Sequence, residues 1–224
     1  MWKDRTIALI GETAVEKLKN MHVCIIGIGG VGGYVCLMLA RAGIENITLV
    51  DFDTIDETNI NRQVVANSKT VGRLKTEIMR EMILEINPSC KIQVLSKRFN
   101  LNMAENLFKT HFDYVVDAID SVQDKVDLIN YCKTHSINIV SAMGAGNRKN
   151  IPQFEVVDIY KTKNDGLARV MRKKLRERQI ESLDVVTSIE KAEKIEENIV
   201  GSISYYPAMC GCVLAGYVIN KLID

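Results

Sequence analysis

Residues 21–51 of the chain read MHVCIIGIGGVGGYVCLMLARAGIENITLVD, and they decide how the fold begins. The apolar run 23–26 is typical of a strand that is buried on both faces. Glycines follow it at G-x-G-x-x-G spacing, and they are Gly27, Gly29 and Gly32. Glycine at these positions lets the backbone turn tightly and lets a ligand approach it closely.

The second half of this stretch completes a strand–turn–helix–strand unit. Residues 34–42 predict a helix that stops at Gly43, and residues 47–50 predict a second buried strand that runs into Asp51. The helix N-terminus can stabilise the charge of a phosphate, and a carboxylate 19 positions after Gly32 can bond a ribose hydroxyl. The unit therefore predicts a nucleotide-binding site.

Strands and helices continue to alternate after this unit. Helices are expected over 70–86, 101–109 and 122–135, and strands over 91–95, 114–116, 138–142 and 154–159. This alternation predicts an α/β fold with a Rossmann-like, doubly wound and mostly parallel sheet. Ligands bind such sheets at the carboxyl ends of the strands, so residues 27–32, 51–62, 117–120 and 144–146 should line one crevice.

The composition pattern divides the chain into three regions of one structural domain. A helical lead-in over 1–20 precedes a nucleotide-binding core over 21–150, and an appended strand and helix region follows over 151–224. The appended region contains a basic helix over 169–178, a charged stretch over 190–198 that is expected to be a mobile surface segment, and an apolar packing helix over 207–222.

The bulk composition narrows the class of protein. The net charge of +1 gives no overall attraction to nucleic acid, so any such contact needs a local basic patch. The charged N-terminus is unlike a secretory signal, and no uncharged apolar run is expected to span a membrane, so we expect a cytoplasmic protein. The six cysteines are scattered without a Cys-x-x-Cys pair, which favours buried free thiols over a zinc site.

Charged residues at the predicted crevice indicate which nucleotide binds there. Backbone N–H groups largely suffice for a dinucleotide pyrophosphate, whereas a triphosphate that loses pyrophosphate develops more charge and gains from aimed cations. Arg62 and Lys75 are such cations, and Asp120 could hold Mg²⁺. The pattern favours ATP and Mg²⁺ as cofactors.

Several segments also resemble a known family. GIGGVGG, LVDFDTIDETNINRQ, VGRLK, INPSC and VVDAIDS are similar to segments of the ThiF/MoeB/HesA proteins, which are related to the adenylating domain of ubiquitin-activating enzymes. MGAGN, DIYKT and LARVMRKKLRER resemble most the branch of tRNA threonylcarbamoyladenosine dehydratases. The resemblance implies that ATP adenylates a carboxylate on a modified adenosine of tRNA, and that internal attack then expels AMP and closes a cyclic ester.

The resemblance also implies roles for individual residues. Gly27, Gly29, Gly30 and Gly32 would form the nucleotide turn, and Asp51 would bind the ribose. The other implied nucleotide contacts are Asn59, Arg62, Lys75, Asp120, which is also the Mg²⁺ ligand, and Ser121. Arg5 resembles an N-terminal arginine that reaches the ATP of the partner subunit, which implies a homodimer. Arg62, Lys75 and Asp120 are the catalytic candidates.

The basic helix and the cysteines favour the tRNA branch. Six cations fall in ten residues, and they are Arg169, Arg172, Lys173, Lys174, Arg176 and Arg178. No cysteine lies between Cys132 and Cys210, where activators of carrier proteins keep a reactive thiol, so a step that needs no protein thiol fits better.

Other functions remain open from the sequence alone. The first is the activation of a ubiquitin-like or sulfur-carrier C-terminus, and the others are a nicotinamide-dependent oxidoreductase and a binding scaffold without catalysis. The sequence identifies neither the tRNA species nor any sulfur-transfer or electron-transfer partner.

Overall fold

A seven-stranded sheet forms the centre of the molecule. The computed structural model describes residues 2–195 and 199–224. The strand order is β3-β2-β1-β4-β5-β7-β6, and every neighbouring pair is parallel except β7 and β6. The bounds are β1 His22–Ile26, β2 Asn46–Val50, β3 Lys91–Leu95, β4 Tyr114–Asp117, β5 Ile139–Ala142, β6 Phe154–Asp158 and β7 Asp184–Ser188.

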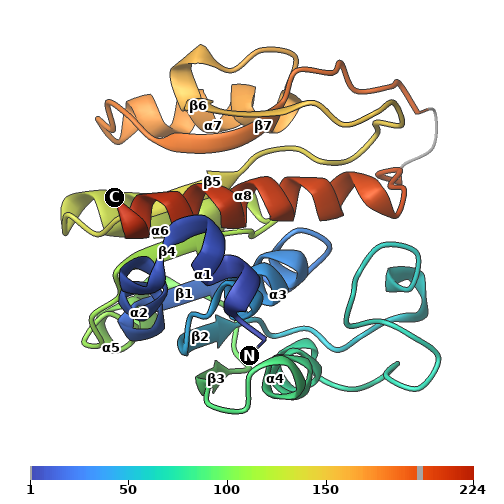
Figure 1. Cartoon of the computed structure of the whole chain (residues 1–224). Helices are drawn as coiled ribbons and strands as arrows, with labels where there is room; N and C mark the ends of the chain where they lie inside the picture. Colours follow the sequence, from blue (N-terminus) through green and yellow to red (C-terminus); the bar gives the residue numbers. More distant parts are fainter. Residues whose placement is uncertain (1, 196–198) are drawn as a thin grey trace.

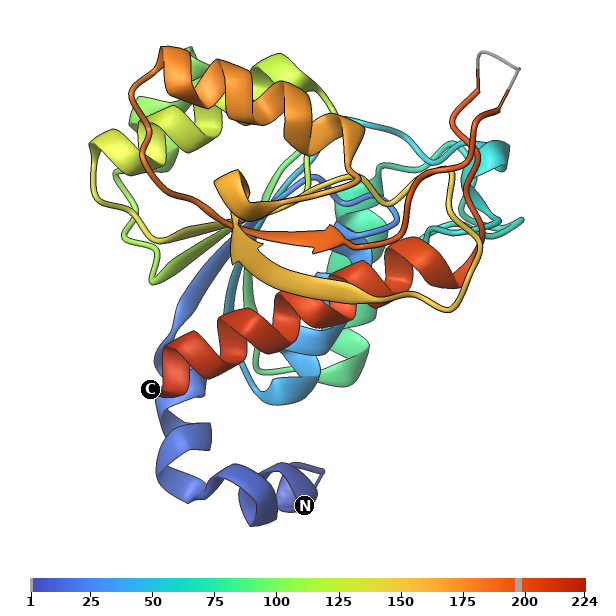
Figure 2. The same cartoon turned by 90° about the horizontal axis from the view of Figure 1, so that it is seen from above.

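Helices cover both faces of this sheet (Figures 1 and 2). On one face lie α2 (Glu12–Asn20), α3 (Gly32–Ala42), α4 (Lys75–Ile86) and α8 (Tyr205–Ile223). On the other lie α5 (Leu101–Leu107), α6 (Val122–Thr134) and α7 (Gly166–Glu177). Short 3-10 turns occur at η1 (Glu57–Asn59) and η2 (Ile159–Lys161). The N-terminal helix α1 (Asp4–Ile10) has no buried residue and stands out from the body of the sheet (Figure 2).

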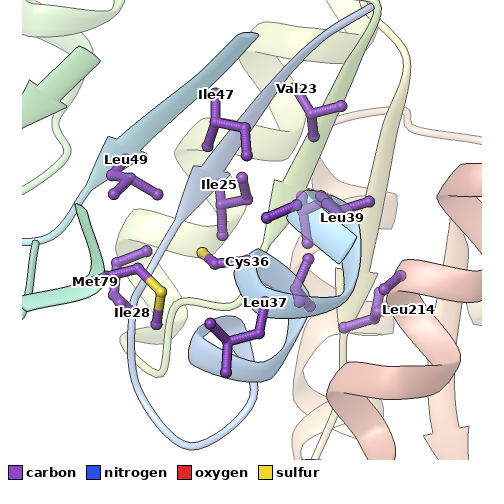
Figure 3. Packing of buried hydrophobic residues seen from close by; sticks show 14 of the residues in the cluster. Val23, Ile25, Ile28, Cys36, Leu37, Leu39, Ile47, Leu49, Met79 and Leu214 are labelled. Carbon is purple, nitrogen blue, oxygen red and sulfur yellow. The ribbon is translucent and has the colours of Figure 1, made fainter. Parts of the chain in front are cut away.

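The packing between β1, β2 and the first helix face fixes where the glycine turn lies. Ile25 and Leu49 are paired in register on adjacent strands, Cys36 and Met79 pack against them from α3 and α4, and Leu214 of α8 joins the same cluster beyond α3 (Figure 3). All five side chains are fully buried. Burial of each large apolar side chain stabilises the fold by about 1.5–3 kcal/mol, so β1 and α3 are held firmly on either side of the turn.

The structure confirms the predicted fold class and most element positions. The strand expected over 91–95 has those bounds in β3, and the helix expected over 34–42 ends at Gly43, which adopts the left-handed conformation. The predicted helix over 70–86 is wrong at its start, because α4 begins at Lys75. Gly72 has a φ of 85°, and its N–H donates to Ile55 O at 2.8 Å, which commits 70–74 to a turn.

Two further observations correct the expectations for the last third of the chain. The strand β7 was not expected, although it carries the only antiparallel partner in the sheet that the structure describes. The expectation that no apolar run reaches membrane-spanning length is wrong for α8, which is long and apolar enough by composition. Its buried stripe, which includes Tyr206, Leu214 and Val218, packs on the sheet and on α3, as a core helix does.

The charged stretch 190–198 was expected to be mobile, and its residues 196–198 lie outside the described residues. In the described part, Glu190 accepts hydrogen bonds from Tyr206 Oη at 2.7 Å and Asn150 Nδ2 at 2.8 Å, and Glu193 N donates to Asn147 O at 2.6 Å. These contacts tie the segment to the loop that follows β5.

Candidate active site

A cavity of about 360 Å³ opens at the carboxyl ends of β1, β2 and β4. It is walled by the glycine turn, by the loop after β2, by the loop after β4, and by residues near the start of α8. Seven of the predicted site residues line it, and they are Gly27, Gly29, Gly30, Asp51, Arg62, Lys75 and Asp120. Residues from Gly27 to Asp120 of the sequence therefore meet on one surface.

At two glycines of the turn an added Cβ would clash with backbone, and at a third the space beside the backbone is open. A Cβ on Gly27 would lie 2.5 Å from Ala118 O, and one on Gly32 would lie 1.8 Å from Gly27 O. A Cβ on Gly29 would meet nothing nearer than Gln63 Nε2 at 3.9 Å. The first and last glycines are thus needed for packing, whereas Gly29 keeps the wall of the cavity open for a close approach.

Asp51 stands at the end of β2 with both carboxylate oxygens oriented. Oδ2 accepts the N–H of Ile28 at 2.6 Å, and Oδ1 accepts the N–H of Asp53 at 2.8 Å. Burial raises the pKa of Asp51, and the two backbone N–H groups oppose this shift because they stabilise the carboxylate. Each oxygen keeps a lone pair for a further donor such as a ribose hydroxyl.

Two cations line the cavity, Arg62 from the 51–62 loop and Lys75 from the start of α4. Lys75 is 5% exposed, and its Nζ lies 2.6 Å from Asp53 Oδ2, which leaves two ammonium hydrogens for a ligand. Arg62 Nη1 donates to Thr58 O at 2.9 Å and to Asn61 Oδ1 at 2.8 Å. These bonds hold the guanidinium at the cavity wall, so both cations are positioned before any ligand binds.

Asp120 lies in the loop that β4 feeds, above a buried polar cluster. Asp117 Oδ1 accepts the N–H of Ile119 at 3.1 Å, while its Oδ2 lies 2.8 Å from Lys125 Nζ and 2.6 Å from Ser141 Oγ. Asp117, Lys125 and Ser141 are all fully buried. The cluster fixes the backbone from which Asp120 projects. In the part of the chain that the structure describes, no three His, Cys, Asp or Glu residues group as a metal site.

Some predicted contact residues lie elsewhere. Asn59 caps η1, its Oδ1 accepting the N–H of Asp56 at 3.2 Å, and it is not among the lining residues. Ser121 precedes α6, and its Oγ accepts from Arg98 Nη2 at 3.4 Å outside the lining set. Gly32 starts α3 behind the turn, and Arg5 is exposed on α1, away from the cavity of its own chain.

The strand order gives the cavity two ends. One end, over β3 and β2, is lined by Val50, Phe52, Arg98 and Phe99. We call the other the acyl end, and it is lined by Ala145, Gly146, Val200, Ser202 and Pro207. A nucleotide whose ribose binds Asp51 and whose phosphates meet the glycine turn places its base at the first end. A second substrate then has access to the phosphates from the acyl end.

Three lining or supporting residues were not singled out from the sequence. Gln63 is 7% exposed, lines the cavity and has an Oε1 without a hydrogen-bond partner among the described residues. Arg98 stacks its guanidinium over the Phe52 ring at 5.8 Å and pairs with Asp124 at 2.7 Å. Arg148 is buried behind the acyl end. Only Gln63, in the segment NINRQ, carried a signal, since it adjoins a predicted site residue.

Intramolecular contacts engage part of the charge of the basic helix. Arg169, Lys173, Arg176 and Arg178 are exposed. Arg172 is half-buried, with Nη1 donating to Thr162 O at 3.1 Å, and Arg178 lies 3.6 Å from Asp127. Arg176 is over the Tyr160 ring at 5.0 Å, and Lys174 is half-buried. The six cations therefore do not form one free patch, because intramolecular partners take up three of them.

The cysteines are free and held as thiols. Burial raises the pKa of Cys132 and of Cys210 to about 12, and it raises the pKa of Cys90 to about 11. Burial also raises the pKa values of Cys24, Cys36 and the half-buried Cys212. A thiol must lose its proton to attack a carbonyl, so none of these groups is a poised nucleophile.

Comparisons with known proteins place this site in a family. The family model of the ThiF family matches residues 3–224. The tRNA threonylcarbamoyladenosine dehydratase of Bacillus subtilis is 35% identical over 96% of this chain and 91% of its own length. The enzyme of that name from Haemophilus influenzae is 42% identical over 73% of this chain and 62% of its own length.

Solved structures agree with the sequence matches. The crystal structure of the Escherichia coli tRNA N6-threonylcarbamoyladenosine dehydratase, TcdA, in complex with ATP superposes with a TM-score of 0.92 at 34% identity, over 99% of this chain and 95% of that one. Its complex with AMP gives a TM-score of 0.93 at the same identity and coverage. The glycine turn, Asp51 and the family match lead to one conclusion: this chain belongs to the ThiF family.

Proposed function

We propose that the protein uses ATP to adenylate the carboxylate of threonylcarbamoyladenosine in tRNA, and that the activated carboxylate then cyclises with release of AMP. One observation carries the proposal: Asp51, the open glycine turn, Arg62, Lys75 and Asp120 line a single cavity. The Escherichia coli relative with the same architecture has been solved in complex with ATP and in complex with AMP, and it and the Bacillus subtilis relative are named as dehydratases of this nucleoside.

ATP would bind along the row of strand carboxyl ends that lines the cavity. Asp51 accepts the ribose hydroxyls, since it lines the cavity and backbone N–H groups hold both of its oxygens in place. Backbone N–H groups of the turn and the N-terminus of α3 bind the phosphates, with Gly29 as the point of closest approach. The base then lies near Phe52 and Arg98, at the end opposite the incoming carboxylate.

The adenylation step transfers the AMP moiety to the carboxylate. A carboxylate oxygen bonds to the α-phosphorus, and the bond to the pyrophosphate oxygen breaks, so negative charge develops on the leaving group. Arg62 and Lys75 donate hydrogen bonds to these oxygens from fixed positions, which lowers the barrier without reorganisation. Internal attack on the acyl carbon then expels AMP and closes the ring. The net loss is one water, whose oxygen leaves with AMP.

Asp120 fits a role in binding Mg²⁺. This ion is usually held by one or two carboxylates together with substrate phosphates, and Asp120 is a carboxylate at the cavity wall. When bound, the ion would neutralise phosphate charge. The lack of a cluster of three such ligands among the described residues fits this mode, because the nucleotide supplies the remaining oxygens.

The raised pKa values of the cysteines support cyclisation without a protein thioester. A carrier-protein activator of the kind that forms a thioester needs a thiolate beside the acyl end, and burial keeps Cys210 and Cys132 protonated near neutral pH. The acyl adenylate of a threonylcarbamoyl group carries its own nucleophile. A dehydratase therefore needs no further reactive group here.

The exposed cations of α7 would bind the tRNA backbone. Arg169 and Lys173 are the exposed members without a partner in the described structure, so they are the strongest candidates. Lys174 and Arg176 add charge nearby, while Arg172 and Arg178 contribute less because they are paired. The first turn of α7 lies beside the acyl end, since Asp165 at its N-cap accepts from Gly144 N at 2.9 Å.

The proposal extends to assembly and location. Trp2, which precedes the projecting α1, and Leu9, which lies on it, are 51% and 85% exposed, which suits burial against a second copy in a homodimer. Arg5 on the same helix would then reach the ATP of the partner subunit. The protein would act in the cytoplasm, where tRNA is its substrate.

The test is conversion of the nucleoside. Incubation with ATP, Mg²⁺ and tRNA that carries threonylcarbamoyladenosine should give a nucleoside lighter by one water, detected by mass spectrometry after digestion. Unmodified tRNA is the control and should be unchanged. Release of AMP without any change in the modified nucleoside would contradict the proposed substrate.

A separate experiment tests the role of α7. The double variant Arg169→Glu, Lys173→Glu should weaken tRNA binding and lower the log–log salt slope by roughly 0.7–0.9 for each lost phosphate contact. ATP affinity should stay unchanged, because neither residue lines the cavity. The matched control is Lys91→Glu on the distant strand β3. Equal tRNA affinity and equal salt slopes in all three proteins would remove α7 from the tRNA interface.

A further inference from the structure

A buried arginine holds the loop that forms part of the acyl end. Arg148 is 5% exposed. Its Nη1 donates to Gly144 O at 2.6 Å and to Gly146 O at 3.3 Å, so it closes a ring around Ala145. Its Nε donates to Glu190 O at 2.9 Å, and its Nη2 donates to Asn164 O at 3.3 Å. One guanidinium thus binds backbone carbonyls of three separate segments.

The same arginine is paired with the carboxylate that caps α7. Asp165 Oδ2 lies 3.7 Å from Arg148 Nη2, and both side chains are almost completely buried. Asp165 Oδ1 accepts the N–H of Ala168 at 2.9 Å, which caps the helix, and Oδ2 accepts the N–H of Gly144 at 2.9 Å. The backbone N–H and C=O of Gly144 are therefore both held by this pair.

The contacts connect two surfaces that the proposed reaction uses together. Ala145 and Gly146 line the acyl end, while the exposed cations of α7 begin one turn after Asp165. The helix α7 also packs through its buried face, which includes Met171 and Leu175. The charged pair adds a direct link between the first turn of α7 and the loop at the cavity wall.

We propose that Arg148 and Asp165 are positioning residues that hold the acyl-end loop in register with α7, so that a tRNA bound on α7 presents its modified adenosine to the α-phosphate. The proposal rests on the proposed function for the identity of the substrate. Neither residue is among those that line the cavity. Their effect reaches the reaction through residues 144–146 and through the first turn of α7.

Three variants separate positioning from stability. Arg148→Met removes all five donors, and Arg148→Lys keeps the charge but offers only three hydrogens. Asp113→Ala is the matched control, because Asp113 Oδ2 accepts the N–H of His22 at 2.7 Å at the opposite, amino end of the sheet. We expect Asp113→Ala to lose stability and to keep its turnover, whereas Arg148→Met loses turnover.

We expect Arg148→Met to lower the rate of the reaction and to leave the affinities for ATP and tRNA unchanged. In Arg148→Met, kcat for tRNA-dependent AMP formation should fall by at least about tenfold, because misplacement of reacting groups by about 1 Å costs up to about 100-fold. Its Kd values for ATP and for tRNA, and the salt slope for tRNA, should equal those of the wild type. Arg148→Lys should lie between the two. A wild-type kcat in Arg148→Met, or a loss of tRNA affinity at unchanged kcat, would overturn the proposal.

Amide hydrogen exchange tests the Arg148 and Asp165 contacts without an activity assay. Peptides that cover 143–149 and 165–169 should exchange faster in Arg148→Met than in the wild type, and the peptide that covers 27–33 should not. The same comparison on Arg148→Lys applies if the Met variant does not fold. Faster exchange spread evenly over the chain would overturn the positioning role. If the exchange comparison gives the expected difference but the wild type forms no product from modified tRNA, only the proposed function is contradicted.

Discussion

Two glycines of one motif should fail in different ways when alanine replaces them. In Gly32→Ala the new Cβ would lie 1.8 Å from Gly27 O and 3.2 Å from Ala118 Cβ. To reach even 3.0 Å from that oxygen, the start of α3 and the turn must separate by about 1.2 Å. Overpacking of this kind costs about 1–3 kcal/mol, and the clash with backbone places Gly32→Ala at the upper end of that range.

Gly29→Ala should leave the fold intact and weaken binding of the nucleotide. Its Cβ would meet only Gln63 Nε2 at 3.9 Å, and Gly29 is not among the residues with positive φ, so the free energy of unfolding should change by less than about 0.5 kcal/mol. The methyl group instead occupies space where a phosphate oxygen approaches the backbone. Loss of one hydrogen bond to a charged group costs about 1.5–3 kcal/mol, which is about 10- to 100-fold in Kd.

Thermal unfolding and calorimetric titration with ATP measure the two effects. At about 2–4 °C per kcal/mol for a chain of this size, Gly32→Ala should lower Tm by about 5–10 °C. Gly216→Ala in α8 is the control, because its Cβ would meet nothing within 4 Å and should slightly raise Tm. If Gly29→Ala bound ATP as tightly as the wild type, or if Gly32→Ala kept its Tm, the reasoning about the turn would be refuted.

Three other perturbations address the charged groups of the cavity. Arg62→Ala should cut AMP formation by about 100- to 1,000-fold, the scale of one lost transition-state donor, with Tm unchanged; a loss below tenfold at saturating ATP would contradict its role. Asp120→Asn should raise the Mg²⁺ concentration needed for half-maximal rate, and an unchanged Mg²⁺ dependence would remove the metal assignment. Burial raises the pKa of Asp51 above its ordinary value of 3.8, so on acidification this carboxylate is protonated at a higher pH than an exposed aspartate. The loss of ATP affinity on acidification should therefore also begin at a higher pH. In Asp51→Asn the affinity should be low and flat with pH over that range, and a variant that kept the wild-type profile would show that Asp51 is not the titrating group.

The parts of the fold that the sequence predicted are those set by local patterns. The run from β1 to Asp51 is local, because apolar strands, a glycine turn and a helix stop at Gly43 each follow from neighbouring residues. The start of α4 is not local. Apolar spacing continues back to Val71, but Gly72 pairs with Ile55 across the loop, and this contact delays the start of the helix to Lys75. That pairing has no signature in the helical pattern.

Charged residues were predicted well where they face the cavity and poorly where they are buried. Arg62 lies in the loop that follows β2 and Asp120 lies just after β4, and parallel topology brings the carboxyl ends of these strands together. Arg148 follows a glycine pair and has the composition of a surface residue, yet four backbone carbonyls bury it. Arg172 is similar, since Thr162 lies ten positions away and becomes its partner only when η2 and α7 pack together. Tertiary packing decides both cases.

The central claim is that this cavity activates a carboxylate carried by tRNA, and one measurement tests it most directly. AMP formation from ATP should be followed with tRNA that carries threonylcarbamoyladenosine, with the same tRNA lacking the modification, and with a carrier-protein C-terminus that ends in two glycines. We expect rapid AMP formation only with the modified tRNA, and its loss in Arg62→Ala. AMP formation that depends on the carrier C-terminus and ignores the modified tRNA would contradict the account.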